Sequence, residues 1–187
     1  MVPTLCRTLG VKGHRPVVGT WDNKHLLYVF ASVNVTSCAL HTDTVESRTG
    51  LYRHTGESKT RRLQRAFANH LRRLGRRYPQ GKHCRVVVLI DNAPWHGGEP
   101  IRRALAEYPQ LELRRLPSYS PQLNVIERFW KLLRRRATHN RLFDTVADLK
   151  RSIRASLCYF QTVRQRIRSL LAKCYPRPVN QTASPGP

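Results

Sequence analysis

Apolar residues along the chain follow two different periods, which separate predicted strands from predicted helices. Leu26 to Val35 and Cys38 to Val45 are rich in β-branched and aromatic residues and flank a short polar turn, which predicts an antiparallel hairpin. Val86 to Ile90 is an unbroken apolar run, so we expect a strand covered on both faces. Leu111 to Leu116 alternates apolar with charged residues and predicts a further strand.

Helical spacing accounts for most of the other apolar residues. Lys59 to Tyr78 has leucines and a phenylalanine on one face and arginines on the other, which predicts a basic amphipathic helix. A shorter helix is expected from Ile101 to Tyr108, after a proline that suits a first helical turn. Val146 to Leu171 predicts a long helix or a helix pair, and Thr145 with Asp148 resembles its capping motif. Strands and helices together indicate an α/β fold.

One carboxylate stands out because of its position in this pattern. Asp91 directly follows Val86 to Ile90, and the turn residues Asn92 to Pro94 end that strand. The order strand, helix, strand predicts a parallel pair whose carboxyl ends lie side by side, where ligand sites of such sheets are found. An ordinary turn or capping role is the alternative for Asp91.

A second carboxylate, Glu127, lies in the early turns of a predicted amphipathic helix after a proline- and serine-rich turn. Trp130 falls on the apolar face of this helix, where we expect it to pack in the core. A helix-borne glutamate beside a strand-borne aspartate supplies the hard oxygen ligands that divalent-metal phosphoryl chemistry uses. The same helix carries the basic residues Arg128, Lys131, Arg134, Arg135 and Arg136.

Two sequence blocks around these carboxylates resemble a known family. D-N-A-P-W-H at Asp91 to His96 and L-P-S-Y-S-P-Q-L-N-V-I-E-R-F-W at Leu116 to Trp130 are similar to the second and third catalytic blocks of DDE transposases. The similarity is to the group of mariner-like elements and related bacterial insertion sequences, whose spacing suits the 35 residues between Asp91 and Glu127. It extends from about Gly10 to Leu149 and implies an RNase H-like fold, a mixed sheet flanked by helices.

The resemblance also implies a mechanism and a set of site residues. Asp91 and Glu127 would be catalytic and would bind Mg²⁺ or Mn²⁺, two ions in an intact site, for attack by water or a 3′-hydroxyl on a DNA phosphodiester. Asn92, His96 and Asn124 are expected near this site. A structural histidine is the alternative for His96. Asn124 is expected to cap the helix, and a polar group near the metals is the alternative. The basic residues of the Glu127 helix are expected to hold the DNA backbone without reading its sequence.

The chain departs from the family pattern at its beginning. The family's triad opens with an aspartate on the first strand, yet Met1 to Leu9 contain no carboxylate. We therefore expect the first strand, its ligand and the family's helix-turn-helix region to be missing, and metal binding to be weak. Asp22 and Asp43 are substitutes to consider, although turn and surface roles are the expectation for both.

Charge narrows the choice of partner. Thirty-four basic residues against eleven acidic ones give a formal net charge of +23, which indicates nucleic acid. No apolar run approaches the roughly 20 residues needed to cross a bilayer, and no secretory signal is evident. We expect a cytoplasmic or nucleoid-associated protein, nuclear in a eukaryotic host, that is not secreted and has no membrane partner. Five cysteines without metal-binding spacing indicate separate reduced thiols.

These patterns predict four regions. Residues 1–24 form an irregular remnant of the amino-terminal part of the catalytic domain, and residues 25–143 form the RNase H-like core. Residues 144–175 form a basic helical segment, and residues 176–187, with four prolines, form a disordered tail.

Two functions are compatible with these features. The first is a transposase DDE domain, for metal-dependent DNA strand cleavage and transfer, in an inactive or incomplete fragment. The alternative is a non-catalytic DNA-binding protein derived from a transposase. A resolvase-like nuclease is disfavoured by the Pro-Ser-Tyr-Ser-Pro block. Expected partners are transposon ends, target DNA, a complementing transposase polypeptide and, in a functional protein, further copies of the chain. Whether the chain alone is an enzyme depends on a third carboxylate.

Overall fold

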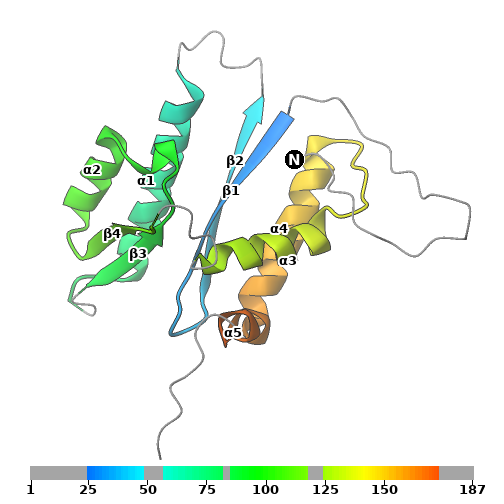
Figure 1. The fold of residues 1–187 in the computed structure, drawn as a ribbon. Helices are drawn as coiled ribbons and strands as arrows, with labels where there is room; N and C mark the ends of the chain where they lie inside the picture. Colours follow the sequence, from blue (N-terminus) through cyan, green and yellow to red (C-terminus); the bar gives the residue numbers. More distant parts are fainter. Residues whose placement is uncertain (1–24, 49–56, 82–84, 118–123, 173–187) are drawn as a thin grey trace, which may run out of the picture.

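The computed structural model describes residues 25–48, 57–81, 85–117 and 124–172. The elements in this part of the chain form an α/β arrangement (Figure 1), as the sequence predicts. In chain order they are β1 (His25–Val33), β2 (Leu40–Arg48), α1 (Lys59–Arg77), β3 (Val86–Ile90), the 3₁₀ turn η1 (Pro94–His96), α2 (Glu99–Glu107), β4 (Leu111–Arg115), α3 (Val125–Ala137), α4 (Val146–Thr162) and α5 (Arg164–Ala172).

The predicted hairpin is confirmed. β1 pairs antiparallel with β2 over its whole length, from His25 opposite Arg48 to Val33 opposite Leu40. The turn between them is held by Asn34, whose Oδ1 accepts hydrogen bonds from the main-chain N–H groups of Thr36 (2.9 Å) and Ser37 (2.8 Å). This is the local side-chain bonding that makes asparagine a good turn residue.

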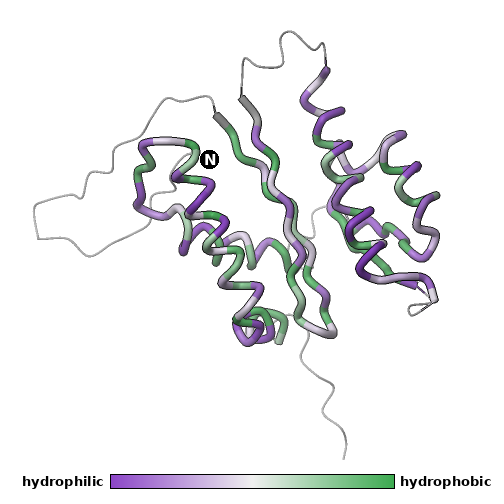
Figure 2. The backbone as a smooth tube through the Cα atoms, turned by 180° about the vertical axis from the view of Figure 1, so that it is seen from behind, coloured by the Kyte–Doolittle hydropathy of each residue, from purple (hydrophilic) through white to green (hydrophobic). Residues whose placement is uncertain are grey.

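The hairpin is the middle of three layers, with α1 and α2 on one side and α3, α4 and α5 on the other (Figure 1). Alternate residues of β1 point to the two sides because side chains of a strand alternate. Val29, Ala31 and Val33 pack against the core of α3, α4 and α5, whereas Phe30 packs against the core of α1. Figure 2 shows hydrophobic residues recurring along the hairpin and the helices, interrupted by hydrophilic ones.

The second pair of strands is parallel, as predicted. β3 and β4 pair from Val86 opposite Leu111 to Ile90 opposite Arg115, and α2 is the crossover between them. Val86, Val88 and Ile90 contribute to one hydrophobic cluster with α1 and α2. Among the described residues the two strand pairs are separate two-stranded sheets rather than one mixed sheet, because no ladder joins β1 or β2 to β3 or β4.

The expectation that β3 is covered on both faces is wrong. Val87 and Leu89 remain 46% and 53% exposed, although Ile90 on the opposite face is only 6% exposed. The register places Val87 beside Glu112 and Leu89 beside Arg114, so this face of the sheet mixes apolar and charged side chains. An apolar run does not reveal whether both faces have a covering layer, because that layer comes from distant parts of the chain.

The predicted helices are confirmed with small changes at their ends. Ser58 caps α1 by accepting a hydrogen bond from the Arg61 N–H (3.2 Å), and Thr145 caps α4 by accepting one from the Asp148 N–H (3.1 Å). The carboxyl-terminal pattern is a helix pair, α4 and α5, divided at Val163.

The carboxyl-terminal helices share a core with the hairpin and α3. Phe129 of α3 and Phe160 of α4 are almost completely buried, and their rings meet edge to face with centroids 5.5 Å apart. Trp130 packs against the same cluster, which confirms its predicted core role. In the described ranges, no helix has the length and apolar character needed to cross a membrane. Cys38 and Cys158 are free thiols, as expected.

Candidate active site at the ends of β3 and β4

The turns after β3 and β4 are joined by hydrogen bonds, so the carboxyl ends of these strands meet as predicted. The Leu116 N–H donates to the Ile90 carbonyl (2.8 Å), and Asn92 Nδ2 donates to the Leu116 carbonyl (3.1 Å). Asp91 therefore lies at the carboxyl-terminal edge of the β3–β4 sheet, where hydrogen bonds join the turns that follow the two strands. Its side chain is 51% exposed, and its Oδ1 accepts a hydrogen bond from the Ala93 N–H (3.0 Å).

His96 lies directly beside this aspartate. Its Nδ1 is 2.8 Å from Asp91 Oδ1 and 3.3 Å from the Asp91 carbonyl oxygen. The ring also packs against Phe67 of α1, with centroids 4.4 Å apart, and the side chain is only 13% exposed. The histidine thus connects Asp91 to the core, and this contact fixes the orientation of the carboxylate. A catalytic role for His96 stays a prediction.

Glu127 lies in the first turn of α3 and is partly buried. Its N–H donates to the Asn124 carbonyl (3.1 Å). Asn124 occupies the N-cap position, but its side chain makes no capping hydrogen bond, so the expected side-chain cap is absent. In Figure 1 this first turn is the end of α3 nearer to β3. The proline- and serine-rich turn before it, at residues 118–123, lies outside the described residues.

Asp43, a candidate third ligand, has a carboxylate that is paired with two basic side chains. Oδ2 lies 2.6 Å from His70 Nδ1, and Oδ1 forms an ion pair with Arg73. His70 is 2% exposed, and its Nε2 is 2.8 Å from the Ser32 hydroxyl. This network joins both strands of the hairpin to α1. Asp22, the other substitute, lies outside the described residues.

The Asp43 network was not foreseen as a unit, although the sequence contains a signal for it. His70 interrupts the apolar face of α1 between Phe67 and Leu71, and Asp43 is a carboxylate within a predicted strand. A buried histidine on an apolar face requires a polar partner. The pattern does not identify that partner, since residues 43 and 70 are brought together only by the packing of α1 on the hairpin.

The surroundings of the Asp43 network lower the pKa of a neighbouring histidine, His41. Burial lowers the pKa of His41 from its ordinary value of 6.5, and the positive charges of His70 and Arg77 lower it further, while Asp43 acts in the opposite direction. The His41 ring stacks edge to face on Tyr78, and its Nε2 lies 2.9 Å from the tyrosine hydroxyl.

The basic residues of α3 differ in their contacts and in their exposure. Arg134 Nε donates to the Trp130 carbonyl (3.3 Å), and the Arg136 guanidinium stacks on Tyr159 at 3.7 Å from the ring centroid. The exposed members of the set are Arg128, Lys131, Arg135 and Arg136.

The donor chemistry of Asp91 and Glu127 suits a hard divalent cation, since both offer carboxylate oxygens. Within the described residues, however, no group of three or more histidine, cysteine, aspartate or glutamate side chains comes close enough together to hold a metal ion. The residues therefore fit such an ion in kind, but the described part of the chain does not supply a complete set of protein ligands.

Comparison with known proteins decides the family. The sequence model described as DDE superfamily endonuclease matches residues 42–150, more than half of the chain. The chain belongs to the DDE superfamily of endonucleases. The resemblance seen in the Asp91 and Glu127 blocks is thereby confirmed, and both blocks lie within the matched segment. Domains of this superfamily generally use divalent metal ions, and their partner is DNA.

Two curated relatives match part of the chain. An uncharacterized protein y4pE/y4sA of Sinorhizobium fredii is 32% identical over 84 residues, which are 45% of this chain and 58% of the relative. An uncharacterized 39 kDa protein of insertion element IS630, from Shigella sonnei, is 29% identical over 99 residues, which are 53% of this chain and 27% of the relative. The chain thus spans 58% and 27% of these two proteins, and no solved structure matches it.

Proposed function

We propose that this DDE superfamily domain belongs to the transposase of an insertion element and contributes Asp91 and Glu127 to a metal-dependent DNA strand-cleaving site. The observation that carries the proposal is the fixed edge at the ends of β3 and β4, which presents the half-exposed Asp91 carboxylate. The insertion-element relative supports transposition as the setting.

The chain's own residues suggest distinct roles in such a site. Asp91 offers a carboxylate that His96 and the Ala93 N–H orient from one side. Glu127 lies in the first turn of α3 and offers a second carboxylate. When bound, a Mg²⁺ or Mn²⁺ ion, two in an intact family site, supplies electrostatic stabilisation of the charge that develops on the reacting phosphate oxygens.

Exposed basic residues at the start of α3 and in its last turns support a DNA contact beside this site. Arg128, Lys131 and Arg135 are exposed, and they are spaced so that a phosphate backbone could reach them. Arg134 and Arg136 already have intramolecular contacts, so we expect them to contribute less to DNA binding.

We further infer that this chain does not complete the catalytic site by itself. Asp43 is held by His70 and Arg73, and no three potential metal ligands converge within the described residues. A non-catalytic DNA-binding protein is therefore the second candidate function. A complementing transposase polypeptide would restore activity, and the exposed Val87 and Leu89 on one face of β3 support such a partner.

The test is nicking of supercoiled DNA by the purified chain in Mg²⁺ or Mn²⁺, together with calorimetric titration of Mn²⁺. Asp91→Ala and Glu127→Ala are the site variants, and Asp144→Ala removes an exposed carboxylate elsewhere as the matched control. We expect weak Mn²⁺ binding that both site variants abolish and the control retains, with no nicking by the chain alone.

Two results would change this conclusion. Nicking that requires both Asp91 and Glu127 would mean that another residue completes the site and that the chain is an enzyme. Unchanged Mn²⁺ binding in both site variants would contradict the assignment of these carboxylates as ligands and would leave the DNA-binding function.

A further inference from the structure

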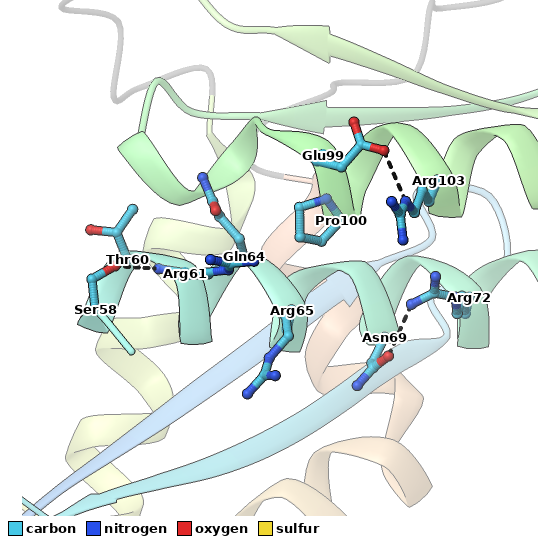
Figure 3. Close-up of a pocket in the computed structure, with 10 residues that line it drawn as sticks. All are labelled: Ser58, Thr60, Arg61, Gln64, Arg65, Asn69, Arg72, Glu99, Pro100 and Arg103. Atoms are coloured by element: carbon cyan, nitrogen blue, oxygen red, sulfur yellow. Dashed lines mark hydrogen bonds and ion pairs between the residues drawn. The ribbon is translucent and has the colours of Figure 1, made fainter. Parts of the chain in front are cut away.

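A second basic feature is a groove between α1 and the start of α2 (Figure 3). The groove has a volume of about 900 Å³, and neither carboxylate of the candidate active site lines it. Four arginines line it, together with the amides of Gln64 and Asn69: Arg61, Arg65, Arg72 and Arg103.

The lysine and arginine residues of α1 are not balanced by any acidic residue in the same helix. The helix contains eight lysine and arginine residues and no carboxylate, so every acidic group that neutralises it comes from another part of the chain. Arg65 pairs with Glu57, and Arg103 pairs with Glu99. Within the described ranges, Arg61 has no ion-pair partner, and this exposed residue lines the groove.

At the other end of the groove one arginine is held in a fixed orientation. Arg72 donates from Nε and Nη2 to the two carboxylate oxygens of Glu107, both at 2.7 Å, and from Nη1 to Asn69 Oδ1 (3.1 Å). The hydrogen bonds to Glu107 also raise the pKa of Arg72 above its ordinary value. Glu107 offsets the charge of Arg72, so this side chain gives the groove an ordered guanidinium rather than net positive charge.

Arg61, Arg65 and Arg72 form a basic row along α1, and its length suits a polymeric anion better than a single phosphate. Arg72 follows Arg61 by eleven positions in the helix, which is about 16 Å along the axis. A DNA strand rises about 3.4 Å per nucleotide, so this row spans about five nucleotides. Guanidinium groups mixed with neutral amides are the donors that typically contact phosphate oxygens.

We propose that the α1–α2 groove, which neither Asp91 nor Glu127 lines, binds the phosphodiester backbone of DNA. The inference rests on the proposed function only in taking DNA as the partner, and it does not depend on a metal site. It gives the domain two places to hold DNA: one where strand cleavage would occur and one that anchors a neighbouring stretch or a second segment.

The experiment measures binding of a fluorescently labelled 30-base-pair duplex by anisotropy, in EDTA, over a series of salt concentrations. Arg61→Glu and Arg65→Glu change the groove, and Arg166→Glu changes an exposed arginine of α5 by the same charge. We expect the groove variants to weaken binding tenfold or more and to lower the salt dependence by about one phosphate contact each. The control should weaken binding less than threefold, and Arg61→Lys should retain most of it.

Equal losses in the groove variants and the control would overturn the proposal, since net charge alone would then explain binding. Displacement of DNA by polyglutamate at equal charge would also overturn it and would point to an acidic polypeptide instead. Because the assay contains EDTA, it reports the groove and not metal binding at Asp91 and Glu127, so failure of the metal site and failure of the groove give different results. Circular dichroism of each variant confirms that it is folded.

Discussion

At the scale of single residues, the same side-chain type has different roles depending on its partners. Asp91 and Asp43 both belong to strand regions, yet Asp91 is half exposed beside a histidine at a sheet edge, whereas Asp43 is 12% exposed between His70 and Arg73. A carboxylate held by two basic groups is poorly placed to accept a cation. The contacts of Asp43 join the hairpin to α1.

His41 gives this region a pH-dependent stability. Because its pKa is lower in the folded chain than the ordinary value of 6.5, the unfolded chain binds the proton more tightly. The contribution of the neutral histidine is complete above 6.5 and is lost as the pH falls from 6.5 toward the lowered folded value.

We therefore expect His41→Gln to reduce the loss of unfolding free energy between pH 7.5 and pH 5.0, as measured by urea denaturation. Glutamine keeps a group that can hydrogen-bond the Tyr78 hydroxyl but does not titrate. A pH dependence identical to that of the unchanged chain would show that other histidines account for the effect.

At the scale of elements, α1 organises the first half of the domain. It covers β3 and β4 together with α2, it joins the hairpin through His70, and it forms one wall of the basic groove. α1 and α2 come close together because Gly75 leaves room for the ring of Tyr108, which follows α2. Gln110 Nε2 reinforces the contact by donating to the Gly75 carbonyl (3.1 Å).

Gly75→Ala should destabilise the domain by about 1–3 kcal/mol, because the added methyl group would overlap the Tyr108 ring in a packed interface. Gly81→Ala is the matched control, since nothing lies within 4 Å of the added methyl group. Urea unfolding of both variants measures the difference. Equal stability of the two would mean that Tyr108 moves aside without cost.

At the scale of the whole molecule, the two faces of β3 have unequal roles. Ile90 belongs to the core under α1 and α2, while Leu89 faces the exposed side of the same sheet. In the chain alone, Ile90 is buried on folding, whereas Leu89 stays about half exposed and stabilises the fold less.

Ile90→Ala should therefore cost about 2–4 kcal/mol of unfolding free energy, and Leu89→Ala less than about 1 kcal/mol. Chemical denaturation at low protein concentration provides the comparison. If a partner polypeptide covers this face, its addition should raise the cost of Leu89→Ala and leave that of Ile90→Ala unchanged. A large cost for Leu89→Ala in the isolated chain would contradict the exposed face.

The sequence by itself determined the elements and the family. Periods of two and 3.6 residues depend on neighbours within a few positions, so the hairpin, α1, the β3–α2–β4 unit and the capped start of α4 were predicted close to their observed bounds. The blocks around Asp91 and Glu127 were likewise sufficient for the family, because their residues are contiguous.

Only the tertiary structure decided how these elements share faces and partners. The exposure of Val87 and Leu89, the pairing of Asp43 with His70, and the groove between α1 and α2 all depend on residues far apart in the chain. Such contacts are set by how helices and sheets pack, and local sequence patterns contain little information about packing partners. For the same reason, local patterns do not identify a third metal ligand: the fold brings ligands together from distant parts of the chain.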